Sequence, residues 1–282
     1  MKGPSYTIYF EPDNLAGALA CMDEHGYCVI RGIIDQELVR VLKASIDEVL
    51  DPERDLPPAS NRFHVTFAEY SEPIWRLAEI PAYMNYVEAR TGTDELSWHR
   101  SAAILRTPGD AMGGWHTDYY PTMPVPSTAD EVLNRGQAVG GGLFYLNGSH
   151  PDRSGLAVIE GSHSPDWPGP DGFEMTADRK SFHPEGDDPA SWYGKMDVPG
   201  CVPLVADPGD LICFMPYTYH TNMATHERRY TCGLGFRAKS FNIDIPWPLP
   251  QSAQDRIAAL PDQLQRYAEG YTSIDESWSP GN

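Results

Sequence analysis

The sequence lacks any apolar run long enough to cross a membrane. A membrane-spanning helix needs about 20 consecutive, mainly apolar residues, and no stretch of this chain approaches that length. The opening segment, MKGPSYTIYFEPD, also lacks the apolar centre of a signal peptide. We therefore expect a protein that neither crosses a membrane nor is exported.

Basic residues are scarce. The 282 residues include 21 Lys and Arg against 40 Asp and Glu, which gives a net charge of −19. Nucleic acids, anionic membrane surfaces and polyanionic substrates all require a positive field. The balance excludes these partners and is typical of a well-solvated acidic surface. A small-molecule substrate is the partner we expect, and a monomer and a homodimer both stay open.

Cysteines are few, and their number and spacing do not suggest disulfide pairs. The five cysteines, at positions 21, 28, 201, 213 and 232, are odd in number and form no CxxC motif. Three of them lie in apolar, strand-like runs. This pattern favours buried, reduced thiols, and so a cytoplasmic protein.

The first part of the chain, residues 1–96, reads as mostly helical. Apolar residues recur at helical spacing after residue 13, and His25-Gly26 should end that helix before a strand at 27–31. Asp35 is placed to cap a second helix, whose apolar face includes Leu38 and Leu42. A third helix is expected over roughly 73–91, after a polar connector at 51–61.

From residue 97 to 245 the sequence pattern changes to short apolar runs separated by Gly, Pro and Asp. Such runs suggest a β-sandwich or a double-sheet jelly roll. The expected strands are 101–106, 114–119, 141–146, 155–159, 202–205, 210–215 and 230–237.

Two further segments complete a single expected domain over residues 1–282. The stretch 164–200 is long and rich in Pro, Gly and Asp, which is typical of a lid or binding loop. The C-terminal part, 246–282, contains an amphipathic helix over 251–269 that Pro261 interrupts.

The pattern with the most chemical content is His116-Thr117-Asp118, followed much later by His220 and Arg229. Side chains two apart on a strand point the same way, so His116 and Asp118 can bind one metal ion. A His from a distant strand, His220, would complete a facial set of two imidazoles and one carboxylate. Such a set leaves open positions on the metal and suits non-haem Fe(II) oxygenases.

Alternation along the last strand distinguishes two neighbouring arginines. One face carries Arg229 and Thr231 and then two glycines, which resembles the wall of a cavity beside a bound acid. The other face, which starts at Arg228, is otherwise apolar and should pack under helices. Arg229 is therefore the expected carboxylate anchor, with Thr231 as a second donor and Arg228 as the alternative.

The chain resembles the phytanoyl-CoA dioxygenase family of Fe(II)- and 2-oxoglutarate-dependent oxygenases. The resemblance covers most of residues 20–240, in order. Its motifs are HGYCVIRG at 25–32, LRTPG at 105–109, WHTDYY at 115–120, GLAVIEGSH at 155–163 and PGDL at 208–211, ahead of His220 and Arg229. The resemblance implies a mainly β fold: a double-stranded β-helix (jelly roll) core with helices packed on one sheet.

The resemblance also implies the chemistry. His116, Asp118 and His220 would hold Fe(II), and Arg229 would grip the distal carboxylate of 2-oxoglutarate, with O2 as the second co-substrate and succinate and CO2 as co-products. Asp118 disfavours halogenation, for which a small residue replaces the carboxylate. Hydroxylation is the default outcome, while desaturation, cyclisation and epimerisation use the same ligands. The interval from His220 to Arg229 is shorter than in many members, and Asn222 is not where the family's Asn usually lies.

Several residues are expected on the substrate side. Arg106 is a candidate for a substrate or co-substrate carboxylate, with a surface or core-rim role as an equal alternative. An aromatic rim is expected from Tyr119, Tyr120, Trp167, Trp192, Tyr193 and Trp247. The chain shows no Lys/Arg cluster for the phosphates of coenzyme A, so an acyl-CoA is not the expected substrate. A neutral or cationic metabolite or amino-acid derivative, partly apolar, fits better.

Two alternatives remain at this point. One is a cupin-like jelly-roll metalloenzyme that does not use 2-oxoglutarate; the other is a non-catalytic jelly-roll binding protein. The remaining histidines that invite a ligand role, His99, His163 and His226, are interpreted as structural or solvated.

Overall fold

The computed structural model describes residues 4–118, 129, 132, 142–188, 192–241 and 243–279. Its centre is a seven-stranded sheet in the order β1-β2-β10-β5-β12-β4-β3. The strands are β1 Tyr9–Phe10, β2 Tyr27–Ile30, β10 Leu211–Phe214, β5 Leu143–Tyr145, β12 Arg229–Ala238, β4 Leu96–Arg106 and β3 Asn61–His64. All its pairings are antiparallel except β1 with β2.

A smaller sheet faces it, and the two sheets line opposite walls of one cavity. This sheet has the order β11-β6-β9, with β11 at His220–Asn222, β6 at Leu156–Ile159 and β9 at Cys201–Pro203. A separate hairpin pairs β7 (Phe173–Met175) with β8 (Phe182–Pro184). The mainly β fold expected from the sequence is therefore confirmed.

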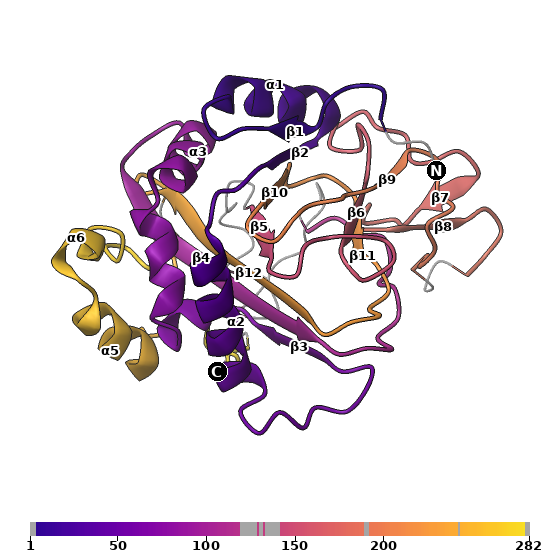
Figure 1. The fold of residues 1–282 in the computed structure, drawn as a ribbon. Coiled ribbons are helices and arrows are strands. Elements are labelled where there is room, and N and C mark those ends of the chain that lie inside the picture. Colours follow the sequence, from indigo (N-terminus) through magenta and orange to yellow (C-terminus); the bar gives the residue numbers. More distant parts are fainter. Residues whose placement is uncertain are drawn as a thin grey trace.

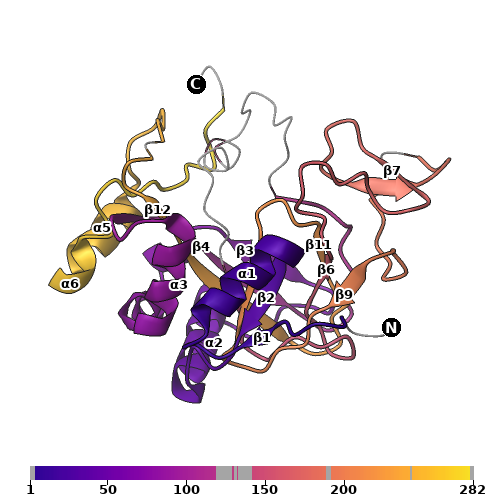
Figure 2. The ribbon, with the colours of Figure 1, turned by 90° about the horizontal axis from the view of Figure 1, so that it is seen from above.

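Helices cover the outer face of the large sheet. These are α1 Leu15–His25, α2 Gln36–Leu50 and α3 Pro81–Thr91, and the chain later adds α5 Gln251–Ala259 and α6 Asp262–Gln265. Figures 1 and 2 place α5 and α6 at one side of the molecule and the β7–β8 hairpin at the opposite side. Side chains of β12 such as Tyr230 and Cys232 pack with Leu42 and Ile46 of α2 in one apolar core.

Local sequence signals explain the first helices. Gly26 adopts a left-handed conformation with φ of 94°, and its N–H donates to Met22 O at 2.8 Å, which ends α1. The Asp35 side chain accepts from Leu38 N at 2.7 Å and caps α2, as expected.

The single helix expected over 73–91 is wrong. The structure has a 3-10 helix at Pro73–Glu79 and then α3, with Ile80 extended at φ −93° and ψ 110°. Pro81 disfavours the helical conformation of the residue before it, and itself fits the first position of a new helix. The helical spacing of the apolar residues continues across this break, which is why the sequence suggested one helix.

Most expected strands occur, with shifted ends. The strand expected at 101–106 begins earlier, at Leu96, and the one expected at 230–237 becomes β12. The short strands β1, β3, β7 and β8 were not expected. The strand expected at 114–119 is wrong for its described part: residues 114–118 form one isolated bridge, at His116. The expected interruption at Pro261 separates α5 from α6.

The cysteines are free thiols, and Cys201 alone among the five is not fully buried. Cys28 and Cys213 lie directly opposite each other on β2 and β10. Contact with Cys213 and burial raise the pKa of the Cys28 thiol, and burial raises the pKa of Cys21 to about 11. The Cys21 and Cys28 thiols therefore stay protonated at neutral pH.

Across the described part of the chain, no helix combines the length and the apolar character that crossing a membrane demands.

A buried carboxylate attaches the C-terminal segment to the sheet. Glu69 accepts hydrogen bonds from Tyr271 Oη at 2.5 Å, from Ser252 Oγ at 2.6 Å and from Ser273 Oγ. Residues 67–69 form a 3-10 turn whose Ala68 N–H donates to Ser101 Oγ of β4 at 2.8 Å. The path from β4 through Glu69 thus fixes α5 and the residues after α6.

Replacing Glu69 with Ala should lower the free energy of unfolding by about 3 kcal/mol, because two buried hydroxyl groups and one half-buried hydroxyl group lose their acceptor. Urea unfolding measures this loss, and limited proteolysis should cut first within residues 251–273. Glu79→Ala is the matched control: Glu79 is exposed and reaches the same segment through Gln263 at 3.3 Å. Equal losses in the two variants would contradict the assignment.

Candidate metal centre

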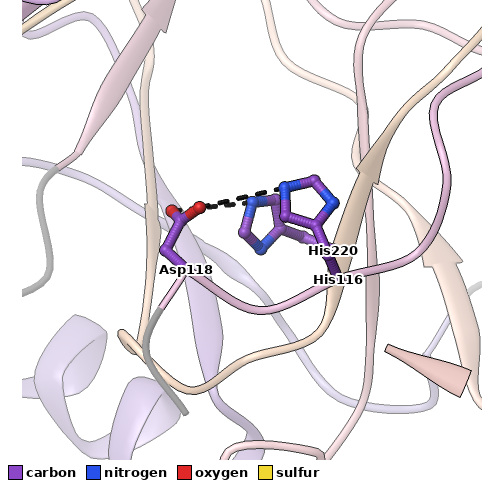
Figure 3. A group of neighbouring side chains, drawn as sticks. All are labelled: His116, Asp118 and His220. Atoms are coloured by element: carbon purple, nitrogen blue, oxygen red, sulfur yellow. Dashed lines mark ion pairs between the residues drawn. The ribbon is translucent and has the colours of Figure 1, made fainter. Parts of the chain in front are cut away.

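His116 and His220 are brought together by an isolated antiparallel bridge. His116 N–H donates to His220 O at 3.1 Å, and His220 N–H donates to His116 O at 2.8 Å. Directly opposed residues carry their side chains on the same face, and the two imidazole centroids are 4.5 Å apart. Asp118, two residues after His116, turns its carboxylate toward both rings (Figure 3). One ligand atom from each of the three residues lies within 4.8 Å of the others.

Backbone carbonyls fix the orientation of both imidazoles. His116 Nδ1 lies 2.9 Å from Gly114 O, and His220 Nδ1 lies 3.0 Å from Thr218 O. A carbonyl only accepts, so Nδ1 carries the proton in each ring and Nε2 presents its lone pair. Each Nε2 is 3.8 Å from one Asp118 oxygen. The three donors converge on one point, which fits a divalent metal ion with three ligands on one face.

The charge states at this site suit metal binding. Burial, with a smaller effect from His220, lowers the pKa of His116 to about 4, so its ring is neutral at pH 7. Desolvation works to raise the pKa of Asp118, but His220, His116 and nearby cations outweigh it and hold that pKa below its usual value. A neutral imidazole and an ionised carboxylate are the forms that bind metal.

The insert that the sequence suggested as a lid braces this segment. Trp115 N–H donates to Tyr193 O at 2.9 Å, Thr117 N–H donates to Lys180 O at 3.0 Å, and Ser181 Oγ donates to Trp115 O at 2.6 Å. Trp115 and Phe182 of the insert belong to a second apolar cluster, separate from the main core. The insert therefore replaces the neighbouring strand that residues 115–117 lack on that side, which explains why a regular strand is not needed there.

A cavity of about 460 Å³ lies beside the three residues, between the two sheets. This volume is typical of a small-molecule site. The wall is formed mainly by even residues of β4 and odd residues of β12, with Ser101 and Leu234 as the exceptions. The lining residues are Asn61, Phe63, Arg100, Ser101, Ala102, Ile104, His116, Asp118, Gly142, Leu143, Tyr145, Leu156, Phe214, Pro216, His220, Asn222, Arg229, Gly233, Leu234 and Gly235.

Arg229 lies in this wall with part of its hydrogen-bonding capacity unused. The side chain is buried, and Nη1 donates to Asn222 Oδ1 at 2.8 Å. Among the described residues, Nε and Nη2 have no hydrogen-bond partner, and neither does the buried Thr231 Oγ1. The Nε–H and one Nη2–H of a guanidinium point the same way, as the fork that binds a carboxylate. Burial lowers the pKa of Arg229 to about 10, so it stays charged at neutral pH. These donors fit the carboxylate of an acid co-substrate.

Arg228 has the opposite environment, on the helix side of β12. Its Nη2 donates to Asp47 Oδ1 at 2.6 Å and to Asp51 Oδ2 at 2.5 Å, and both acids are buried on or next to α2. Its Nε donates to Tyr230 Oη at 2.8 Å. Alternation therefore assigns the two arginines to different faces, as the sequence suggested.

The other expected site residues are dispersed. Arg106 lies outside the cavity lining, and its guanidinium donates to Asp110, to Ala111 O at 2.6 Å and to Met223 O at 3.4 Å. Trp192 stacks on His116 with centroids 5.7 Å apart and is half-exposed. Trp167, which is part of the insert, packs instead on Tyr219.

Tyr193 and Trp247 are also outside the cavity lining, with Trp247 buried beside Trp278. Tyr119 and Tyr120 lie outside the described residues. Of the histidines interpreted as structural, His99 is fully buried, His163 Nε2 contacts Asp23 O at 3.0 Å and His226 is exposed.

Sequence reasoning missed several residues of the wall. Asn222 was noted only as misplaced, although it contacts Arg229, and Tyr145 and Arg100 were not considered as lining residues. The same alternation that identified Arg229 would have found Arg100, because it faces Gly235 in the β12–β4 register.

Comparison with known proteins supports the same chemistry. Residues 22–229 match the family model for phytanoyl-CoA dioxygenase (PhyH). No curated protein sequence matches.

Similar solved structures include the epimerase SnoN in complex with Fe3+, alpha ketoglutarate and nogalamycin RO, with a TM-score of 0.57 and 19% identity over 86% of this chain and 93% of that one. The alpha-ketoglutarate-dependent carbocyclase SnoK has a TM-score of 0.56 and 17% identity over 84% and 88%. HygX from Streptomyces hygroscopicus, with nickel and 2-oxoglutarate bound, has a TM-score of 0.57 and 15% identity over 78% and 86%. At these identities the likeness shows the fold, and it confirms the expected jelly roll.

The two arginines should respond oppositely to replacement by Met, which keeps the length and removes the charge. Arg228→Met leaves two buried carboxylates short of a partner and should lower the free energy of unfolding by about 3 kcal/mol. Arg229→Met removes a buried cation with unused donors, and should leave the stability of the ligand-free protein unchanged or slightly higher. Urea unfolding without metal or 2-oxoglutarate tests this, and a larger loss in Arg229→Met would contradict it.

Proposed function

The chain belongs to the phytanoyl-CoA dioxygenase family, and from this membership we propose how its site works. It is a non-haem iron enzyme that uses 2-oxoglutarate and O2. We propose that it hydroxylates a small, partly apolar metabolite. The observation that carries the proposal is the convergence of His116, Asp118 and His220 beside a cavity that also contains the Arg229 fork.

We assign metal binding to His116, Asp118 and His220. The two imidazoles are pre-oriented by Gly114 O and Thr218 O, so little rearrangement of the rings accompanies binding. When bound, iron and 2-oxoglutarate supply the O2 activation that oxidises a substrate C–H bond, with succinate and CO2 as co-products.

Arg229 and Thr231 are proposed to receive the distal carboxylate of 2-oxoglutarate. Both are buried, and together they offer three donor atoms that have no partner among the described residues. A carboxylate accepts from such donors without creating a new unsatisfied group. This acid site also argues against the two alternatives, a metalloenzyme that does not use 2-oxoglutarate and a binding protein.

The substrate is proposed to lie in the remainder of the cavity. Its wall there is largely apolar, with Phe63, Ile104 and Phe214, and its polar groups include those of Asn61 and Arg100. Trp192, stacked on His116, adds an aromatic surface near the metal. Arg106 is not included, because its guanidinium is already bonded to the adjacent loop.

Hydroxylation is proposed over desaturation, cyclisation and epimerisation as the simplest outcome of C–H oxidation. Neighbours of this fold include an epimerase and a carbocyclase. The reaction outcome therefore depends on how the substrate is oriented in the cavity. The mass of the product distinguishes hydroxylation from the other outcomes.

We further propose that residues 1–282 work as one domain in the cytoplasm. One apolar core joins residues from Ile8 to Tyr271, including the N-terminal helices, the large sheet and the C-terminal segment. The free thiols are consistent with a reducing compartment.

The proposed ligands are tested by anaerobic titration with Fe(II) and then 2-oxoglutarate. We expect a weak visible charge-transfer band in the natural protein and in His226→Ala, whose side chain is exposed. His116→Ala should lose both the band and tight metal binding. Metal binding without a band in the natural protein would refute the Arg229 assignment, and absence of metal binding would refute the function.

Substrate class is tested by product mass. We expect an oxidised product 16 mass units heavier than the substrate, in step with succinate release, for small apolar metabolites. No acyl-CoA thioester should be turned over, because the chain has no cluster of basic residues for its phosphates. Turnover of any acyl-CoA would contradict this.

A further inference from the structure

Asn222 connects the metal ligands to the carboxylate anchor. It lies two residues after His220 on β11, and both residues line the cavity. Its Oδ1 accepts from Arg229 Nη1 at 2.8 Å and from Tyr145 Oη at 3.3 Å. One short strand therefore carries a metal ligand and the group that holds the co-substrate anchor.

The spacing between His220 and Asn222 is rigid. Residues two apart on a strand are separated by about 6.6 Å. β11 pairs with β6, where His220 faces Val158 and Asn222 faces Leu156. On its other side, His116 bonds to His220 and Gly113 N–H donates to Asn222 O at 2.9 Å. A strand hydrogen-bonded on both edges cannot lengthen or shorten this distance.

Asn222 also selects which donors of Arg229 are offered. With Nη1 taken by Asn222, Nε and Nη2 are the donors left toward the cavity. The Tyr145 ring also contacts Arg229, with its centroid 5.2 Å from Cζ, but a ring face does not select which guanidinium donors point toward the cavity. Without Asn222 the long side chain could turn and offer its fork at another distance from the metal.

We propose that Asn222 is a specificity-determining residue that sets the length of the 2-oxo diacid the enzyme accepts. It holds the Arg229 fork at the distance that suits the five-carbon 2-oxoglutarate, and so discriminates against the four-carbon oxaloacetate and the six-carbon 2-oxoadipate. The inference rests on the proposed function, in which Arg229 binds the distal carboxylate.

The charge of the side chain matters as well as its shape. Asp at position 222 has the shape of Asn but would place a carboxylate against Arg229, where it would compete with the co-substrate. A purely structural role predicts that the similarly shaped Asp is tolerated better than Ala. Positioning of a cation for an acid predicts the reverse.

The experiment measures binding of 2-oxoglutarate, oxaloacetate and 2-oxoadipate to the Fe(II)-loaded enzyme by anaerobic calorimetry. Metal affinity is measured separately in the absence of acid. For Asn222→Ala we expect 2-oxoglutarate affinity to fall about tenfold, with preference over 2-oxoadipate reduced by a similar factor. For Asn222→Asp we expect a fall of about 100-fold or more, since the anchor is neutralised. Metal affinity should change less than about twofold in both variants.

Asn85→Asp, which adds the same charge on the exposed side of α3, is the matched control and should bind as the natural protein does. The inference is overturned if Asn222→Asp binds 2-oxoglutarate better than Asn222→Ala, or if the preference for chain length is unchanged in Asn222→Ala. Failure of the natural protein to bind 2-oxoglutarate would instead refute the proposed function, so the two failures are distinguishable.

Discussion

The arrangement of the site depends on the two backbone hydrogen bonds between His116 and His220. They join segments far apart in the chain and place two imidazoles side by side without any long strand. Everything else is positioned relative to them: Asp118 follows two residues after one partner, and Asn222 two residues after the other. The insert supplies hydrogen bonds on the far side of Trp115 and Thr117. The proposed metal centre is thus built on a short piece of β-structure that is hydrogen-bonded on both edges.

Alternate residues of β12 have different roles: those on one face pack in the core, and those on the other face the cavity. On its helix-facing side, Arg228 donates hydrogen bonds to Asp47 and Asp51, and the apolar side chains pack in the core. Its cavity-facing side leaves Arg229 and Thr231 with unused donors. Buried donors without partners cost free energy, so their persistence fits a site shaped for a ligand and not for the ligand-free fold.

Local chemistry in the sequence was sufficient for much of this. Alternation identified the cavity face of β12, and the capping signal at Asp35 was correct. The sequence pattern also predicted that His116, Asp118 and His220 lie together, as they do in the structure. What the sequence could not supply were the long-range contacts. The irregular composition of residues 164–200 predicts a lid or binding loop, but it does not reveal that the backbone of this insert braces Trp115 and Thr117. Nor does the sequence reveal that Asp110 and Ala111 O accept hydrogen bonds from Arg106. Asn222 was judged against a spacing and not against its partner Arg229, which only the register of β11 brings near.

The burial of the thiols affects how well such an enzyme withstands oxidation. An enzyme that combines iron with O2 is exposed to oxidants, and cysteines are oxidised chiefly as exposed thiolates. Here burial hides most of the thiols and keeps Cys21 and Cys28 protonated. Oxidation should therefore spare Cys21 and Cys28, and Cys201 is the cysteine most open to it.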